Sequence, residues 1–430
     1  MLTGLRIENL KSVQDSGRLR LRPLTILMGP NSSGKSTLLD AILLAKQTVD
    51  SKDPRNPVVM YGDYVKLGSF PEVVFRNEKA RTLALEFEFS PFDVRRAASV
   101  ESATVRAEFS YNRKSLQTYA TRVTYTLPPT DFRIEKTSPT PHKASVEILD
   151  KDESIFRSEG HPGKFYDLPR SPRRVARWRA GSDLQLFAPW QFESQLKGVS
   201  YIGPLRTAPQ RTYLAGGEMP QGVGLQGEMT LSALWASRWS KPLRQRVYKR
   251  TSDWLARFGI AATLELRRIG GSYFTCLIAD PSLGVKANFA DVGFGSSQLL
   301  PAIVQTLLAP AGTTIVMEQP EIHLHPAAQA VLGDFFVEQS LEGKQFIVET
   351  HSEHMVSRAL TRVARRDITP DHLGILYCSR TPEGTKVERV DVDSYGRFGE
   401  GLPRGFFEQD YLEARAQMEA LAGGRESARE

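Results

Sequence analysis

The chain of 430 residues is too long for one simple hydrophobic core, so two or three lobes are expected. Its composition, 40% hydrophobic and 24% charged, is that of a soluble globular protein, and no apolar run approaches the roughly 18 residues that a membrane span needs. The net charge of +7 permits a nucleic-acid partner without requiring one. Cys276 and Cys378 lie far apart and the N-terminus lacks a secretory apolar segment, so we expect no disulfide framework, no cysteine metal site and a cytoplasmic location.

The first 50 residues predict two strands, a loop and a helix. "LTGLRIENLKSV" alternates apolar and polar residues, "PLTILMGP" is typical of a buried strand, and "GKSTLLDAILLAKQTV" has helical spacing. Between residues 65 and 150, the segments "TLALEFEFS", "ATVRAEFSY", "YATRVTYTL" and "KASVEILD" alternate with a period of two. They predict an antiparallel β region.

The rest of the chain returns to helices and parallel strands. "HPGKFYDLPRSPRRVARWRAGSD" predicts an inserted loop or short helix, residues 228–258 predict helices, and Gly270-Gly271 predicts a hairpin turn. From Asp291 onward, helices alternate with strands. The α/β parts at the two ends are therefore expected to form two halves of one parallel sheet, with the middle of the chain inserted between them. The expected units are 1–80, the N-terminal half of the core; 81–195, a β-rich lobe with the basic insertion; 196–290, a helical and hairpin connection; 291–415, the C-terminal half of the core; and 416–430, a frayed tail.

A phosphate-binding loop is predicted at "GPNSSGKST", which fits G-x-x-x-x-G-K-[ST]. Glycines let backbone N–H groups surround an anion, Lys35 reaches the terminal phosphates, and the Ser36 hydroxyl can bind Mg²⁺. The alternative is a glycine turn with an incidental lysine, but the preceding apolar strand and the following helix favour a nucleotide site. The candidate nucleotide-binding residues here are Gly29, Pro30, Asn31, Ser32, Ser33, Gly34, Lys35, Ser36 and Thr37.

Three later segments supply candidate partners for this loop. Glu318 ends the apolar strand of "IVMEQPE" and can bind Mg²⁺ directly or through water; the alternative is a strand that ends in solvated charge. His351, at the end of "FIVETHS", can reach a γ-phosphate or an attacking water, although taken alone such a histidine is more often a structural residue. "GFGSSQ" opens a helix whose N-terminus can bind phosphate, against the alternative of an ordinary glycine-rich helix start. Its candidate residues are Gly295, Ser296, Ser297 and Gln298.

Taken in order, these segments resemble the ABC-type ATPases, and specifically the branch that contains the RecF, SMC and OLD (overcoming lysogenization defect) ATPases. "HLHP" after the acidic strand and "YIGPLRTAPQRTYLAGG" are similar to the OLD-like group. The resemblance covers both ends of the chain and is weak across residues 80–195. It implies an α/β fold: an ABC-type ATPase head with a β-rich N-terminal lobe and an inserted helical and basic segment.

The resemblance also implies roles for single residues. "GFGSSQ" corresponds to the signature that reaches the γ-phosphate of a second subunit, "IHLHP" to the D-loop at that interface, and Thr350 with His351 to the switch segment. Gln319 takes the position of the usual glutamate general base. Because an amide cannot accept a proton at pH 7, we expect slow hydrolysis and long-lived ATP-bound dimers. Glu321 is a candidate substitute base, and Gln47 a weak candidate for the Q-loop glutamine.

Two further groups of residues have two interpretations each. His323 and His325 lie two positions apart without a third metal ligand, which favours interface or packing roles. The basic segment between His161 and Ala180, with Trp178 interleaved, fits contact with a nucleic-acid backbone or a solvated loop with scattered ion pairs. Arg206 and Arg211 are expected to be structural or interfacial. The nucleic-acid candidates are Lys164, Arg170, Arg173, Arg174, Arg177 and Arg179.

The predicted function is an ATPase that uses ATP and Mg²⁺ and dimerises around the nucleotide. We find no nuclease motif, and the roughly 80 residues after His351 are too few for the Toprim domain that OLD-type proteins often carry, so any cleavage would come from a separate effector. The resemblance implies a nucleotide-gated regulator or sensor in bacterial phage defence or DNA maintenance. The alternative is a RecF-like repair ATPase that binds DNA directly. A subunit of an ABC transporter fits the β-rich insertion poorly.

Overall fold

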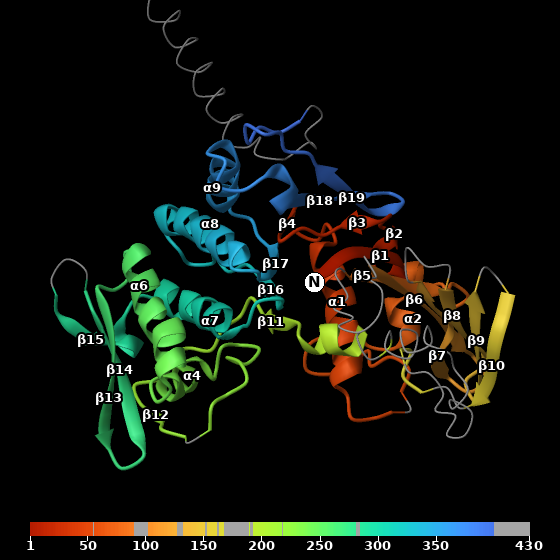
Figure 1. The fold of residues 1–430 in the computed structure, drawn as a ribbon, viewed down its shortest axis with the longest axis horizontal. Helices are drawn as coiled ribbons and strands as arrows, with labels where there is room; N and C mark the ends of the chain where they lie inside the picture. The colour runs from red at the N-terminus through yellow and green to blue at the C-terminus, as the bar shows by residue number, and fades with distance from the viewer. Residues whose placement is uncertain are drawn as a thin grey trace, which may run out of the picture.

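The computed structural model describes residues 1–54, 56–89, 102–126, 132–150, 153–160, 163–166, 189, 192–216, 218–280 and 284–399. Figure 1 shows a β-rich lobe and a helical lobe on either side of a central sheet. Within the described residues, no helix has the length and apolar character required to cross a bilayer. The frayed tail expected at residues 416–430 lies outside the described residues.

The central sheet joins the two ends of the chain, as predicted. Its strands lie in the order β11, β16, β17, β4, β18, β19, and all neighbours are parallel except β18 and β19. The core strands read as apolar runs because both faces are covered. One strand of this sheet, β11, comes from the middle of the chain, which the sequence did not predict. The bounds are β4 Leu24–Met28, β11 Ser200–Ile202, β16 Thr314–Glu318, β17 Gln345–Glu349, β18 Leu373–Thr381 and β19 Gly384–Val390.

Helices α1, α7, α8 and α9 connect these strands, and short helical turns lie beside them. Their bounds are α1 Lys35–Asp50, α7 Phe294–Leu308, α8 Pro326–Leu341, α9 Glu353–Ala364, α2 Phe70–Val73, η1 Phe75–Asn77, η4 Phe289–Asp291 and η5 Pro370–His372.

The predicted antiparallel region is a second sheet, of nine strands among the described residues. Its path is β10-β9-β8-β7-β6-β5-β1-β2, with β3 paired to β1. Alternation of buried and partly exposed residues along β6 confirms the period-two pattern. The N-terminal strand β1 pairs with β5, so the unit boundary expected at residue 80 runs through this sheet. The bounds are β1 Leu2–Leu10, β2 Val13–Asp15, β3 Leu19–Arg20, β5 Leu83–Phe89, β6 Ala103–Asn112, β7 Gln117–Thr126, β8 Phe132–Thr140, β9 Lys143–Asp150 and β10 Glu153–Gly160.

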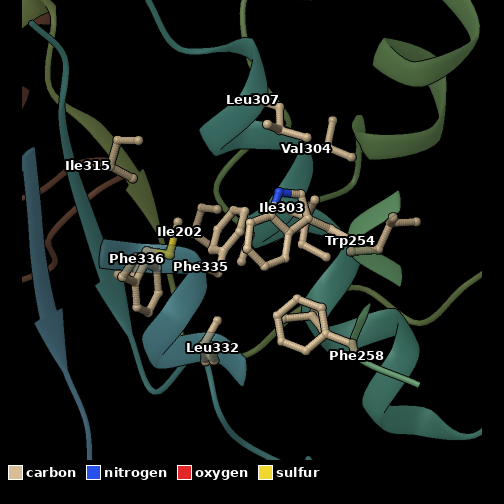
Figure 2. Close-up of a cluster of buried hydrophobic side chains, with 14 of the residues drawn as sticks. Ile202, Trp254, Phe258, Ile303, Val304, Leu307, Ile315, Leu332, Phe335 and Phe336 are labelled. Atoms are coloured by element: carbon tan, nitrogen blue, oxygen red, sulfur yellow. The ribbon is translucent and has the colours of Figure 1, made fainter. Parts of the chain in front are cut away.

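The helical lobe packs against the central sheet through a large apolar core. The predicted helices of residues 228–258 are present, and the predicted hairpin turns at two glycines with positive φ. Figure 2 shows Trp254 and Phe258 facing Phe335, with Ile303 beside them. The Trp254 and Phe335 rings meet edge to face at 4.7 Å. The bounds are α4 Thr230–Ser237, α5 Lys241–Leu243, η3 Arg244–Lys249, α6 Arg250–Arg257, β12 Tyr213–Leu214, β13 Thr263–Gly270, β14 Tyr273–Ala279 and β15 Lys286–Asn288.

Gln47 has a structural role, so its assignment as a Q-loop glutamine is wrong. The side chain is buried in α1, where Oε1 accepts hydrogen bonds from Tyr64 N at 2.9 Å and Val65 N at 3.0 Å. Its Nε2 donates to Val59 O at 2.8 Å and Val65 O at 3.1 Å. All four bonds are used to attach the segment of residues 59–65 to the helix that follows the phosphate loop.

Replacing Gln47 by alanine is expected to destabilise the protein by about 3 kcal/mol or more, because four backbone groups lose a partner. Exchange of the Tyr64 and Val65 amide hydrogens should accelerate, which hydrogen-exchange mass spectrometry can measure on peptides that cover residues 59–67. The matched control is Gln245→Ala, an exposed glutamine of η3. Equal protection of residues 59–67 in both variants would contradict this role.

Candidate functional site

The predicted phosphate loop joins β4 to α1 and has backbone conformations that require glycine. Gly29 has a φ of 140° and Gly34 a φ of 100°. A Cβ at Gly29 would collide with the carbonyl oxygen of Cys378, and one at Gly34 with the side chain of Thr385. The Thr385 hydroxyl also donates to Ser33 O at 3.0 Å. Strands β18 and β19 therefore pack directly behind the loop and fix its shape.

Lys35 lies at the start of α1 with its ammonium group inside the loop. It is 4% exposed and donates to Gly29 O at 2.9 Å and Pro30 O at 2.8 Å. Burial lowers the pKa of Lys35, although the nearby Glu349 carboxylate, 3.9 Å away, favours the charged form. Both of these hydrogen bonds from the ammonium group go to carbonyls of its own loop, which phosphate oxygens can replace.

The Ser36 hydroxyl donates to Glu349 Oε2 at 3.0 Å, a contact that the sequence reasoning missed. Glu349 ends β17, and β17 is the strand directly beside β4. Burial raises the pKa of Glu349, while Lys35 and the Ser36 hydroxyl lower it. The signal is present in "FIVETHS", where an apolar strand ends in the carboxylate of Glu349, two positions before His351.

These residues surround a hollow of about 400 Å³ at the edge of the central sheet. It brings together most of the predicted loop residues with Gln319 and Glu349, and it adds Lys11, Ser12 and Asp40. Lys11 and Asp40 form an ion pair at 2.8 Å. The predicted residues that line it are Asn31, Ser32, Ser33, Gly34, Lys35, Ser36, Thr37 and Gln319; Glu318 and His351 do not.

Glu318 ends β16, one strand farther from the loop than Glu349. Its Oε1 accepts a hydrogen bond from the Tyr201 hydroxyl at 2.6 Å, and its backbone carbonyl accepts one from Arg206 at 3.1 Å. Burial raises the pKa of Glu318, and the negative charges of Glu349 and Asp40 add to this effect. Burial also lowers the pKa of Arg206 to about 10. The expectation that Arg206 is structural is consistent with its contact to this strand end.

Gln319 directly follows β16 and lines the hollow. Its φ of 44° lies in the left-handed region, and its N–H donates to Glu349 O at 2.8 Å. This backbone bond ties the ends of β16 and β17 together. The Gln319 side chain is therefore an amide beside the predicted phosphate site, where a carboxylate would act as a general base.

Glu321 is buried beside the segment of Thr350 and His351 and supports its backbone. It is 7% exposed, and Oε1 accepts from His351 N at 2.8 Å, with a further bond to the Thr350 side chain. His351 lies at the surface, where part of its side chain is accessible to solvent. The partial burial of its imidazole ring, together with the Lys35 charge, lowers the pKa of His351. Neutral imidazole at pH 7 can donate or accept a hydrogen bond.

The signature segment opens α7, as predicted, but most of its side chains lie inside the subunit. Ser296 is 7% exposed, Ser297 5% and Gln298 2%, so their side chains do not present themselves to a second subunit. Gly293 is exposed, Gly295 is partly exposed, and the first turn of α7 begins between them. The assignment therefore changes: the accessible donors are the backbone N–H groups at the helix N-terminus.

Two other candidate groups are also clarified. His325 caps α8, since Nδ1 accepts from Ala327 N at 3.3 Å, and no cluster of metal-binding side chains occurs among the described residues. Lys164 is 7% exposed and donates to Val49 O and Ser51 O at 3.0 and 2.5 Å, so its assignment as a nucleic-acid contact is wrong. Arg211 pairs with Asp291 at 2.6 Å. The other basic candidates, Arg170, Arg173, Arg174, Arg177 and Arg179, lie outside the described residues.

Thermal stability without Mg²⁺ is expected to fall as pH rises through the folded-state pKa of Glu349. That pKa is raised above 4.5 by burial, so the folded protein holds this proton more tightly than the unfolded chain. The stabilisation is complete below the unfolded pKa and disappears as the buried group ionises. Glu349→Gln should therefore raise the Tm at neutral pH by roughly 1–3 °C, with the difference vanishing near pH 4. Melting curves recorded in the presence of a chelator measure this difference, and Glu383→Gln, in an exposed turn, is the control. A lower Tm for Glu349→Gln than for wild type at pH 7 would contradict the expected direction of the change.

Comparisons with known proteins match two parts of the chain to ATPase family models. Residues 1–159 match a family model described as "AAA ATPase domain", and residues 276–357 match one described as "AAA domain, putative AbiEii toxin, Type IV TA system". The chain thus contains AAA-family ATPase domain sequence in both halves of its central sheet. No curated protein matches it.

Among solved structures, the chain is similar to SMC head domains at low sequence identity, with TM-scores below 0.5. The SMC head domain from Thermotoga maritima shares 15% identity and a TM-score of 0.44, over 91% of this chain and 99% of that chain. An SmcHead bound to the C-winged helix domain of ScpA has 13% sequence identity and a TM-score of 0.48, over 91% of this chain and 97% of that chain. An Smc head domain with an extended coiled coil, bound to the C-terminal domain of ScpA derived from Pyrococcus furiosus, has 12% identity and a TM-score of 0.44, over 91% of this chain and 96% of that chain. The mixed α/β fold is that expected from the sequence.

Proposed function

We propose that this chain, two parts of which match AAA-family ATPase models, binds ATP with Mg²⁺, hydrolyses it slowly and dimerises around it to act as a nucleotide-gated regulator. The observation that supports this most strongly is the hollow beside the phosphate loop. It joins Lys35 and Ser36 of the phosphate loop with Glu349 at the end of β17 and the amide of Gln319 after β16, three segments that lie far apart in the sequence. Each part of the proposal draws on a different contact.

Triphosphate binding depends on the loop between Gly29 and Thr37. The N-terminus of α1 directs its unpaired N–H groups and positive dipole into the hollow. Lys35 would leave the carbonyls of Gly29 and Pro30 for the terminal phosphates, and phosphate oxygens are stronger acceptors than those carbonyls because the bond is charge-assisted.

The side chains beside the loop fit a magnesium ion. Hard oxygen donors suit Mg²⁺, and the Ser36 hydroxyl and the Glu349 carboxylate already lie 3.0 Å apart. Glu349, from the strand beside the loop, would hold the ion directly or through water. Glu318, fixed by Tyr201, would act from one strand farther away. When bound, the ion neutralises charge on the phosphates and polarises them toward attack.

Slow hydrolysis follows from Gln319. Its amide can orient a water molecule by a hydrogen bond but cannot remove its proton. The nearby carboxylates are already engaged: Glu321 with His351 N, Glu318 with Tyr201 and Glu349 with Ser36. The closed ATP-bound state should therefore persist long enough to serve as a signal.

Dimerisation would place the exposed start of α7 against the γ-phosphate bound by a second copy. The backbone N–H groups between Gly293 and Gly295 are the accessible donors on this segment, and the helix dipole favours an anion there. Closed two-fold dimers are the commonest symmetric assembly, and this contact is reciprocal in such a dimer.

The cellular role is proposed from the OLD-like segments and from the family description over residues 276–357, which names a type IV TA system. Both favour a regulator that works with a separate effector, in phage defence or DNA maintenance. To test this, the tagged protein is recovered from its host with or without a non-hydrolysable ATP analogue. We expect one protein to be retained with the analogue by wild type and lost with Lys35→Ala. Retention that is identical in both proteins, or absent in wild type, would contradict a nucleotide-gated partner.

A further inference from the structure

An open groove lies on the β-rich lobe, away from the phosphate loop. Its volume is about 870 Å³, and it runs between the segment after α1, the start of α2, and the turns of the β6–β7 and β8–β9 hairpins. Figure 1 shows these elements together in the orange and brown lobe. A groove of this size is within the range of small-molecule sites, but it is open and is lined by several exposed residues.

Aromatic rings are the main chemical feature of this groove. Tyr61, Tyr111 and Tyr119 line it, and Tyr111 stacks on Phe70 with a centroid separation of 6.0 Å and an interplanar angle of 6°. Tyr61 is 68% exposed, at a turn in which Gly62 N donates to Val65 O at 2.9 Å. A large ring that remains exposed on an ordered turn is available to stack on a ligand.

Positive charge lies next to these rings. A second hollow of about 420 Å³ shares Tyr111 and Leu116 with the groove and is also lined by Lys79 and Arg113. Both cations are exposed, and neither forms an ion pair within the described part of the chain. Among the described residues that line the two hollows, Asp53 is the single carboxylate. The charge of the combined surface therefore favours an anionic ligand.

We propose that this groove binds single-stranded nucleic acid, with bases stacked on Tyr61 and its neighbours and phosphates beside Lys79 and Arg113. Rings with adjacent unpaired cations are the combination that single-strand binding uses. A proline-rich peptide would use the rings but not the cations, and duplex DNA would use the cations but not the rings.

The groove is also connected to the phosphate loop through α1. Gln47 bonds to Val59, Tyr64 and Val65, on the segment that carries Tyr61. The Tyr64 ring meets the Tyr201 ring edge to face at 6.4 Å, and the Tyr201 hydroxyl bonds to Glu318. A ligand in the groove would thus be the trigger of the regulator. This role as a trigger rests on the proposed function, whereas binding of the ligand in the groove is independent of it.

The test is the affinity of the full-length protein for a fluorescent single-stranded oligonucleotide of about 12 nucleotides, within the range that one compact single-strand-binding fold covers. Tyr61→Ala should weaken binding about 5- to 150-fold, the effect of losing one base–ring stack, and Tyr61→Phe should retain it. Arg113→Gln should reduce the slope of log K against log salt by roughly 0.7. The matched control is Tyr395→Ala, a tyrosine of similar exposure (65%) far along the chain.

Three outcomes would overturn the proposal. Wild-type protein that binds ATP but no oligonucleotide would remove the groove's function while the proposed ATPase stands. Equal losses for Tyr61→Ala and Tyr395→Ala would place binding elsewhere, as would duplex binding that is as tight as single-strand binding and independent of Tyr61. Oligonucleotide binding by a protein that binds no ATP would instead support the groove and contradict the proposed ATPase.

Discussion

Replacing Gln319 by glutamate is expected to accelerate ATP hydrolysis by about 10²- to 10⁴-fold, the usual contribution of a general base. Gln319 lines the hollow beside the phosphate loop, and its backbone is fixed by a 2.8 Å hydrogen bond to Glu349 O. A carboxylate at the same position would therefore lie where an attacking water is expected.

The measurement is phosphate release under saturating ATP and Mg²⁺ for wild type, Gln319→Glu and Gln319→Asn. The asparagine variant keeps a neutral amide and should remain as slow as wild type or slower. Combining Gln319→Glu with Glu349→Gln should abolish the gain, because the proposed magnesium ligand is lost. Wild-type turnover that already matches ordinary enzymes, about 1 s⁻¹ or faster, would show that another group removes the proton.

Lys35→Ala is expected to weaken ATP binding by about 10²-fold or more, because the ammonium group that is proposed to contact the phosphates is lost. At an ATP concentration near 100 times Kd, bound nucleotide adds about 2.7 kcal/mol to the stability of the wild type. The accompanying rise in Tm should be absent in Lys35→Ala and intact in Lys52→Ala, an exposed lysine just after α1. An unchanged Tm shift in Lys35→Ala would exclude the loop as the nucleotide site.

Local sequence patterns predicted the elements of the core well. The phosphate loop, the alternating strands of the β lobe and the Gly270-Gly271 turn each depend on a spacing or residue type within a few positions. The strand order confirms the prediction that the two ends of the chain share one sheet. This prediction was possible because apolar strands with short connections have few other ways to bury both faces.

The order of the strands could not be predicted from the sequence. Glu318 was expected to bind Mg²⁺ directly or through water, but β17 lies between β16 and β4, so Glu349 is the carboxylate that contacts the Ser36 hydroxyl. A single sequence gives no indication of which acidic strand end is adjacent to the loop. Nor does it indicate that the carboxylate of Glu321, a candidate base, accepts a hydrogen bond from the His351 backbone.

Burial was the second property that local patterns could not reveal. Lys164 lies in a basic, proline-rich stretch whose composition is typical of a solvent-exposed loop. Its ammonium group is nevertheless buried and donates to two backbone carbonyls at the end of α1. Ser296 and Ser297 were expected at a surface, and the helix turns them inward. In each case, a tertiary contact outweighed the composition of the surrounding segment.

The central claim, that two copies clasp ATP between them, is tested most directly by the mass of the ATP-loaded protein in solution. Gly293 caps α7 with an ordinary φ of −51°, and the space beside it is open. The Gly293→Asp variant should therefore fold, and its aspartate should cap the helix well. Its negative charge would repel the γ-phosphate bound by a second copy. Light scattering with ATP and Mg²⁺ should give a dimer for wild type and Gly293→Ser, and a monomer for Gly293→Asp and Lys35→Ala. Wild type that stays monomeric when saturated with ATP, or Gly293→Asp that dimerises as wild type does, would contradict the claim.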